Sequence, residues 1–409
     1  MIEWNEQHKM IQEMTQRFVQ AEIVPHLEEL EHGDSPPYEV MRKLVSTFGI
    51  AEAARMRYEA EKHRAADGKP AKADSDERST GADIGLQLIP IIELSKYCPG
   101  MVTAMGVSMG LTANAIMNKG TWRQKDRWAL PLLTLEKIGA WAITEPGSGS
   151  DAFGPMKSTA RRDGDDYVLN GAKTFITNGP YADTIVFICK LDRGEADARD
   201  RQVVSFILDK GMAGLTQSKP LRKMGMHSSP TGELFLDNVR AGRDRLMGES
   251  EEAAGGGREA AKATFGQERS GMVAMAYGIV ERCIELCTEY ARTRVQFGKP
   301  IGEFQLIQLK LATMQVARIN IRNMLFRQIE LAAHGKRLSF AEASANKLYA
   351  AQATMEVCLE AVQLFGGNGY MAEYQVEQLC RDAKVLQIYG GTDEIQTSQI
   401  ARSMLAGDA

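Results

Sequence analysis

Helical periodicity gives way to strand periodicity around TARRDGDDYVLNG, Thr159 to Gly171. The pattern predicts two short strands joined by an Asp-Gly turn, because β-branched and aromatic residues flank a dipeptide that favours tight turns. The segments that follow carry the same signals: KTFITNG, TIVFICKL, VVSFILD and GELFLDNV. We therefore expect an antiparallel β domain over residues 134–250.

The sequence on either side of this segment has helical periodicity. Residues 1–133 are expected to form a helical domain, interrupted at about 59–83 by a polar segment with no hydrophobic residue larger than alanine. Such a segment cannot bury a core face, so we interpret it as a surface insertion, with a lid or docking segment as the alternative. Residues 251–409 return to helical amphipathicity, in stretches at 260–293, 303–334, 339–365 and 376–388. The predicted fold class is α+β: an N-terminal helical domain, a middle antiparallel β domain and a C-terminal four-helix bundle.

Composition excludes several classes of function. The formal net charge is -4 with both signs spread along the chain, so no nucleic acid is expected as a partner. The N-terminus is charged from its third residue and the longest apolar run, IGLQLIPII, is too short for a bilayer, which predicts a cytoplasmic protein without a membrane span. The six cysteines and six histidines show no metal-binding spacing, and Cys283 and Cys287, one helical turn apart, are interpreted as core residues.

Four segments carry the functional signal. WAITEPGSGSDA, Trp141 to Ala152, is a strand that enters a Gly/Ser-rich loop, whose backbone can approach a ligand closely but which also resembles an ordinary surface turn. The others are KTFITNG at 173–179, YARTRVQFGKPI at 290–301, and the stretch from Gln363 to Gln396 that ends in YGGTDEIQ. In this order, across a helix, sheet, helix chain, they resemble the acyl-CoA dehydrogenase family over nearly the whole length.

The resemblance implies a flavoenzyme that binds FAD, oxidises an acyl-CoA thioester to the trans-2-enoyl-CoA, passes electrons to an electron-transferring flavoprotein and assembles as a homotetramer. By position, it implies FAD contacts at Trp141, Ile143, Thr144, Gly149, Ser150, Phe175, Ile176, Thr177, Gln363, Gly366, Gly367, Thr392 and Glu394. It also implies that Arg294, Gln296 and Phe297 reach the FAD of a neighbouring subunit, with the arginine on phosphate. Substrate contacts are expected at Ser150, Ser229, Arg269, Tyr389 and Gly391, although His227 stands where family members frequently have arginine.

The position of the catalytic base departs from the best-known branch of the family. That branch has a glutamate as the second residue of YxGT, whereas this chain has Gly390, which offers only its backbone N–H to the thioester carbonyl. At 100° per residue, Glu268 lies in the middle of an apolar stripe on its helix, while Glu281 and Glu285 point to the opposite side, as solvated acids should. Burial raises the pKa of a carboxylic acid, which suits a general base, although a structural ion pair would also explain a buried glutamate.

The resemblance favours Glu268 as the base, because the isovaleryl-CoA and long-chain branches carry theirs at the matching position; Glu394 is the remaining rival. Two other functions are compatible with this fold: a flavin-dependent monooxygenase, which needs no carboxylate base, and a subunit of a hetero-oligomeric acyl-CoA dehydrogenase. The glycine at 390 opens volume beside the reacting carbons, so a branched, long or bulky acyl group is admitted. The sequence does not identify that acyl group.

Overall fold

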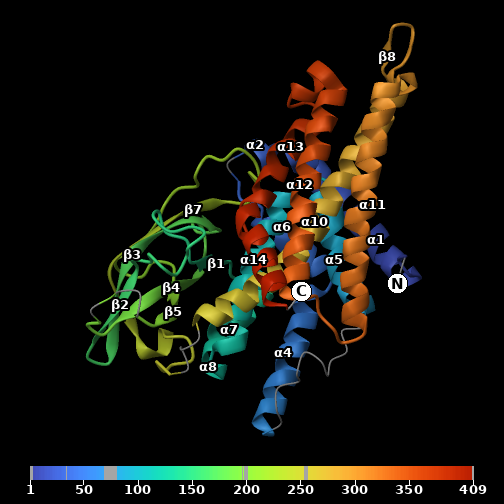
Figure 1. Ribbon diagram of the computed structural model, residues 1–409. Coiled ribbons are helices and arrows are strands. Elements are labelled where there is room, and N and C mark those ends of the chain that lie inside the picture. The colour runs from blue at the N-terminus through green and yellow to red at the C-terminus, as the bar shows by residue number, and fades with distance from the viewer. Residues whose placement is uncertain are drawn as a thin grey trace.

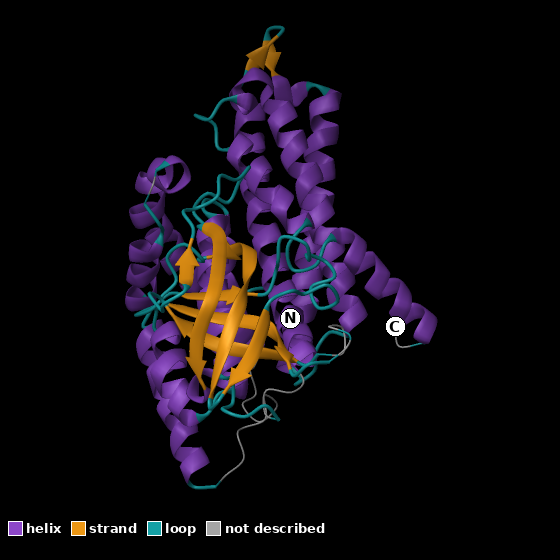
Figure 2. Cartoon of the chain, turned by 90° about the vertical axis from the view of Figure 1, so that its left-hand side faces the viewer, coloured by secondary structure: helices purple, strands orange, loops and turns teal. Residues whose placement is uncertain are grey.

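The computed structural model describes residues 3–33, 35–68, 81–195, 197, 201–252 and 257–407, and leaves out the side chains of residues 81–83, 257–268 and 270. Within these ranges the order helix, sheet, helix is confirmed (Figure 1). The sheet lies beside the helices, which extend well beyond it at one end (Figures 1 and 2). The α+β fold class predicted from the change of period is therefore correct.

The N-terminal part consists of short helices linked by π-helical and 3-10 turns. Helix α4 continues through Ala66, so the first residues of the predicted polar insertion are helical, while residues 69–80 lie outside the description. Tyr58 anchors this helix by donating a 2.6 Å hydrogen bond to Asp126. The helices are α1 (Glu6–Phe18), α2 (Leu27–His32), α3 (Tyr38–Thr47), α4 (Ile50–Ala66), α5 (Gly81–Ser95), α6 (Pro99–Met105), α7 (Asn114–Lys119), α8 (Trp122–Gln124) and α9 (Leu130–Leu133), with π-helical turns at Val19–Ile23, Gly106–Ala113 and Lys125–Ala129.

The sheet is mixed, which corrects the prediction of a purely antiparallel domain. Strand β4 pairs in parallel with both β1 and β2 and antiparallel with β5. Parallel pairing needs a crossover connection, which the chain supplies by completing the β2–β3 hairpin before β4 begins. The strands are β1 (Gly139–Ala142), β2 (Thr159–Asp163), β3 (Asp166–Thr177), β4 (Thr184–Asp192), β5 (Val203–Asp209), β6 (Leu215–Gln217) and β7 (Thr231–Gly242).

Strand β4 is buried on both faces, which explains its apolar run TIVFICKL. Ile185, Phe187 and Cys189 face the interior of the β domain, whereas Val186 and Ile188 pack with Trp128 and other residues of the N-terminal helices. A strand covered on both sides has a continuous rather than alternating apolar pattern. The N-terminal helices therefore form a layer on one face of the sheet.

The C-terminal helices form the predicted bundle, with α10 at its centre. α10 contacts α5, α11 and α12, and it is buried on all sides from Met272 to Val280. Glu285 is exposed, as predicted, whereas the Glu281 side chain is only 17% exposed; they pair with the buried Lys96 at 3.0 and 3.2 Å respectively. The elements are α10 (Gly257–Thr293), β8 (Val295–Gln296), β9 (Lys299–Pro300), α11 (Gln305–Ala333), α12 (Phe340–Phe365), α13 (Val376–Ala383) and α14 (Asp393–Ala406).

The two cysteines that are one turn apart, Cys283 and Cys287, are both fully buried in the core of this bundle, as interpreted from the sequence. Helix α12 begins at a capping box, in which Ser339 and Glu342 exchange hydrogen bonds between side chain and backbone. This fixes where α12 starts and hence which of its residues face α14.

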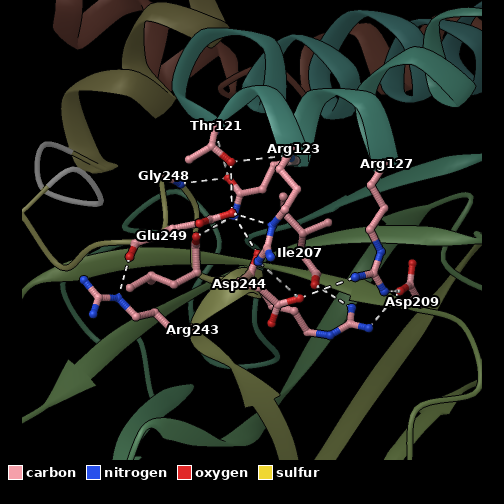
Figure 3. Close-up of polar contacts among 12 residues, drawn as sticks. Thr121, Arg123, Arg127, Ile207, Asp209, Arg243, Asp244, Gly248 and Glu249 are labelled. Carbon is pink, nitrogen blue, oxygen red and sulfur yellow. Dashed lines mark hydrogen bonds and ion pairs between the residues drawn. The ribbon is translucent and has the colours of Figure 1, made fainter.

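A polar network joins the N-terminal helices to the sheet (Figure 3). Arg127 contacts Asp209 and Asp244, each at 3.4 Å, and Arg123 contacts Glu249 at 3.2 Å. Between them the fully buried Gln124 donates to the carbonyl oxygens of Asp244 and Leu246 at 2.8 and 2.7 Å. The network fixes the helical layer against the end of β5 and the segment that follows β7, because buried carbonyl groups need donors.

One described stretch, Pro99–Lys119, is long and apolar enough to cross a membrane by length and composition, and half of it is buried inside the protein. It is also bonded to the sheet, since Ser108 Oγ accepts from Gly139 N at 2.9 Å. Core helices of folded domains meet the same criteria, so the absence of a membrane span stays a prediction.

Candidate active site

The first two predicted flavin segments lie side by side at one edge of the sheet. Thr174 N, in KTFITNG, donates to Thr144 O, in WAITEPGSGSDA, at 2.9 Å. Phe175, in KTFITNG, has a positive φ of 57°, and 70% of its surface is exposed to solvent. The register of β3 against β7 shifts at this point, and such a bulge redirects a side chain. A bulky residue held in the left-handed region with its ring exposed indicates a functional position.

A buried ion pair between Lys173 and Glu145 joins these two segments. Lys173 Nζ, with a fully buried side chain, lies 2.9 Å from Glu145 Oε1 and donates to Ile143 O at 3.0 Å. Glu145 also accepts from the backbone N–H groups of Lys157 and Ser158, at 2.7 and 2.9 Å. Burial opposes ionisation of Glu145, but the Lys173 ammonium and these donors outweigh it and lower its pKa. Burial lowers the pKa of Lys173, with Glu145 opposing.

Helix α6 connects the sheet edge to the C-terminal turn YGGT. Asn178, fully buried with a positive φ of 63°, donates to Ala104 O in α6 at 2.9 Å and to Gly139 O at 3.0 Å. The neighbour of Ala104, Thr103, has its hydroxyl 3.5 Å from Tyr389 Oη. Helix α6 therefore contacts both the KTFITNG segment and Tyr389 of the YGGT turn.

The turn at residues 389–391 is built from two glycines in left-handed conformations. Gly390 has φ 61° and Gly391 has φ 91°, values that residues with a side chain rarely adopt. Gly390 N–H has no acceptor among the residues that the structure describes. Tyr389 donates to Met275 Sδ in α10 at 3.7 Å, which places the turn against the helix that carries the predicted base. A half-buried backbone donor without an acceptor is available to a ligand.

The predicted base, Glu268, lies in α10, but its side chain is outside the description. Its neighbour Arg269 is buried and donates to Ser344 Oγ in α12 at 3.0 Å, with its guanidinium 4.4 Å from the centre of the Phe340 ring. The rival, Glu394, is exposed in the first turn of α14. Hydrogen bonds from its own backbone and from Thr392 lower its pKa, which is the opposite of what a general base for a weakly acidic C–H requires.

A second group of predicted flavin residues lies far from the first. Arg294, Gln296 and Phe297 occupy the exposed β8–β9 hairpin at the end of the bundle, where Phe297 is 94% exposed (Figure 1). Gln363, Gly366 and Gly367 lie at the same end, since Phe365 stacks on Tyr290 with ring centres 4.1 Å apart.

The two groups are separated along α12. Lys347 of this helix contacts Gly391, whereas Gln363 is about 24 Å farther along the axis, at a rise of about 1.5 Å per residue. Thr392, which caps α14, and Glu394 belong with the Gly390 turn. Hydrogen bonds therefore connect the sheet-edge segments at 141–144 and 173–178, through α6, to the turn at 389–392, whereas the hairpin group lies at the far end of the bundle. Gly149 and Ser150 are exposed in the loop that follows Thr144.

The predicted outer substrate contacts, Ser229 and Arg269, are buried. Ser229 Oγ has no hydrogen-bond partner among the described residues. Next to it, His227 lies between two backbone carbonyl oxygens, with its ring nitrogens 2.7 Å from Glu31 O and 2.9 Å from Lys223 O. The histidine that departs from the family pattern thus links α2 to the loop before β7.

Two residues of this site, Lys347 and Gln396, were not singled out from the sequence. Both are fully buried and both donate to carbonyl groups of the 389–391 turn. The sequence feature that could have identified them is a charged or amide side chain at an interior helical position, in ANKLYA and DEIQ. A separate cavity of about 210 Å³ between α1, α5, α10 and α11 is lined by charged residues such as Glu93 and Arg318, and by none of the predicted site residues.

Comparison with known proteins agrees with this arrangement. Residues 140–239 match the family model described as the acyl-CoA dehydrogenase middle domain, and residues 255–405 match the C-terminal domain of the same family. The short-chain-specific acyl-CoA dehydrogenase of Megasphaera elsdenii is 37% identical over 316 residues, which cover 77% of this chain and 80% of that protein. The 3-(aryl)acrylate reductase of Clostridium sporogenes is 32% identical over 404 residues, 98% of this chain and 99% of the reductase. A crystal structure of acyl-CoA dehydrogenase from Geobacillus kaustophilus superposes with a TM-score of 0.85 at 31% identity, covering 98% of each chain.

Proposed function

This chain belongs to the acyl-CoA dehydrogenase family, and from that premise we propose that it removes hydrogen from the α and β carbons of an acyl-CoA thioester to give the trans-2-enoyl-CoA. It is an oxidoreductase whose cofactor is FAD. The structure of the sheet edge and of the Gly390 turn supports the finer assignment, residue by residue.

The residues at the sheet edge fit a flavin. The two segments joined by the Thr174–Thr144 hydrogen bond carry an exposed aromatic ring on a bulged strand, at Phe175, and the half-buried indole of Trp141, and the first of them continues into the exposed Gly149 and Ser150. Backbone and hydroxyl donors beside flat apolar groups suit a ring that is apolar on its faces and polar at its edge. When bound there, FAD supplies the acceptor for the hydride that leaves the β carbon.

The observation that carries the proposal is the N–H of Gly390, which has no acceptor within the described part of the chain. Such a half-buried backbone donor can bind the thioester carbonyl and stabilise the negative charge that grows on its oxygen as the α-proton leaves. The left-handed φ of 61° explains why glycine suits this position, since a side chain here would strain the backbone. For the hydrogen bond to the thioester carbonyl, residue 390 needs to supply only its backbone amide.

We assign the removal of the α-proton to Glu268. Its helix contacts the turn through Met275 and Tyr389, and the adjacent Arg269 binds α12 one turn before Lys347, which itself binds Gly391. The rival Glu394 has a lowered pKa and an exposed position. An exposed carboxylate at a helix N-terminus loses basicity, because the helix end stabilises its charged form.

We also propose that the functional unit is a homo-oligomer, a tetramer as the family resemblance implies. The exposed Phe297 and Arg294 of the hairpin are too far from the same chain's sheet edge to share one flavin with it, so they serve the flavin of a second copy. All four flavin segments are present in this one chain, which favours a homo-oligomer over a hetero-oligomeric subunit. The proposed electron acceptor is an electron-transferring flavoprotein, and the proposed location is cytoplasmic.

The test is anaerobic mixing of the flavin-loaded protein with straight, branched, ring-bearing and aryl-bearing acyl-CoA thioesters, followed by flavin absorbance. At least one thioester should bleach the flavin, and the product should be its trans-2-enoyl derivative. Arylacryloyl compounds belong in the panel because one relative is named as an arylacrylate reductase. The proposal fails if no thioester reduces the flavin while NADPH or a flavin reductase supports insertion of oxygen, which is the outcome for a monooxygenase.

A further inference from the structure

Lys347 is a buried lysine whose ammonium group contacts the turn at residues 389–391. Its side chain, at 0% exposure, extends from α12 so that Nζ donates to Gly391 O at 2.8 Å and lies 3.5 Å from Asp393 Oδ1. Burial of an ammonium group is expensive unless it is paired and hydrogen-bonded. Here the ammonium reaches the backbone of the turn that presents the Gly390 amide.

Gln396 acts on the same turn from the other side. Its fully buried amide Nε2 donates to Gly390 O at 3.0 Å and to Gly391 O at 2.9 Å, while its backbone N–H donates to Thr392 O at 2.9 Å. Packing here is close, because a Cβ added to Gly391 would lie 2.6 Å from Gln396 Nε2. Two consecutive carbonyl groups of the turn thus receive three side-chain hydrogen bonds.

The turn needs this support. Two adjacent glycines have more accessible backbone conformations than any other pair of residues, so the observed φ values of 61° and 91° are not imposed by sterics. On the upstream side, Tyr389 N bonds to Val385 O at 3.0 Å. The donors from Lys347 and Gln396 fix the peptide planes on the downstream side, so the Gly390 N–H between them has one orientation.

We infer that Lys347 and Gln396 are positioning residues that hold the Gly390 N–H toward the thioester carbonyl before substrate binds. The inference deepens the proposed function and rests on it. A donor that is already oriented stabilises developing charge without reorganisation during the reaction, which is the main advantage of a preorganised site. Glycine at residues 390 and 391 makes the side chains that restrain these peptide groups essential, because neither residue has a side chain of its own to pack.

The experiment measures the oxyanion donor without turnover. A 3-oxoacyl-CoA has an acidic α-carbon, and its enolate absorbs in the near ultraviolet, so titration of the bound ligand gives the pH midpoint of enolate formation. In the wild type this midpoint should lie below that of the free ligand. In Lys347→Met, and separately in Gln396→Leu, we expect it to rise by about one pH unit, a tenfold loss of enolate stabilisation. Flavin reduction should slow by about tenfold to a hundredfold, less than the ~10²–10³-fold cost of losing such a donor outright.

Two further variants separate positioning from stability. Lys347→Gln keeps a donor without the charge, so its midpoint should lie between those of the wild type and Lys347→Met. Lys310→Met is the matched control: this lysine also reaches α12, at Glu360, but away from the turn, and its midpoint should equal that of the wild type. A structural role alone would lower the melting temperature of Lys347→Met or Gln396→Leu and leave the midpoint of bound ligand unchanged.

The inference is overturned if Gln396→Leu and either of the two Lys347 variants keep the wild-type midpoint and the wild-type rate of flavin reduction. Gln396→Leu retains this power if Lys347→Met fails to fold, since it adds no charge and removes no salt bridge. Failure of the proposed function is distinguishable: the wild type itself would then neither shift the midpoint nor reduce its flavin with any thioester.

Discussion

Replacement of Lys173 by methionine tests whether the buried ion pair holds the two flavin segments together. The side chains of Lys173 and Glu145 are 0% and 5% exposed, and the substitution leaves the carboxylate with two backbone donors but no counter-charge. Breaking a buried pair on one side costs about 3–5 kcal/mol. The hydrogen bond to Ile143 O is lost as well, at about 1 kcal/mol. We therefore expect Lys173→Met to lower the free energy of unfolding by roughly 4 kcal/mol.

Denaturant unfolding of the flavin-stripped protein measures this loss, and flavin fluorescence measures FAD affinity separately. FAD should bind at least about tenfold more weakly, because about 1.4 kcal/mol spent on reordering the loops corresponds to a factor of ten. Lys62→Met is the matched control, since it breaks an exposed, solvent-screened pair with Asp126 and should destabilise the protein far less than Lys173→Met.

A double-mutant cycle with Glu145→Gln identifies the mechanism. Removing both charges should cost clearly less than the sum of the two single changes, with a coupling of about 2 kcal/mol or more. The reasoning is refuted if Lys173→Met is no more destabilising than Lys62→Met, or if the two single effects simply add.

The remaining predictions concern the base, the hairpin and a titrating group. Glu268→Gln should bind flavin normally and slow its reduction by acyl-CoA about 10²–10⁴-fold in stopped-flow traces; near wild-type reduction, with Glu394→Gln inactive, would reassign the base. Rescue by Gly390→Glu in that background is expected to be poor, because φ at residue 390 is 61°. Arg294→Ala should lower FAD occupancy and loosen assembly together in sedimentation runs, and full occupancy at low FAD would contradict its role. Burial, with Asp382 nearby, raises the pKa of Glu31 to about 8 from 4.5, so stability should fall as pH rises between these values, by at most about 1.4 kcal/mol per pH unit, and Glu31→Gln should flatten that slope in denaturant titrations.

Local features of the sequence were sufficient to predict the element types. The β2–β3 hairpin forms where it was predicted, although Asp163 pairs with Asp166, so its two turn residues are Gly164 and Asp165 rather than Asp163 and Gly164. Helices α10, α11 and α12 begin and end within a few residues of the predicted limits. Such features depend on neighbours a few residues apart. Side-chain environments in the bundle were less predictable: Glu281 looked solvated on a helical projection, yet Lys96, which directly follows α5, pairs with it.

The sequence by itself determined the order helix, sheet, helix, the family, and the absence of a carboxylate at residue 390, because periodicity, turn residues and motifs are properties of short segments. Only the tertiary structure decided that β4 runs parallel to β1 and β2, that the hairpin group is remote from the sheet edge, and that the Gly390 turn is held by Lys347 of a different helix. These relations join residues far apart in the chain. They are set by which faces can bury their apolar area together and by which buried donors reach a carbonyl group, and no local pattern encodes either.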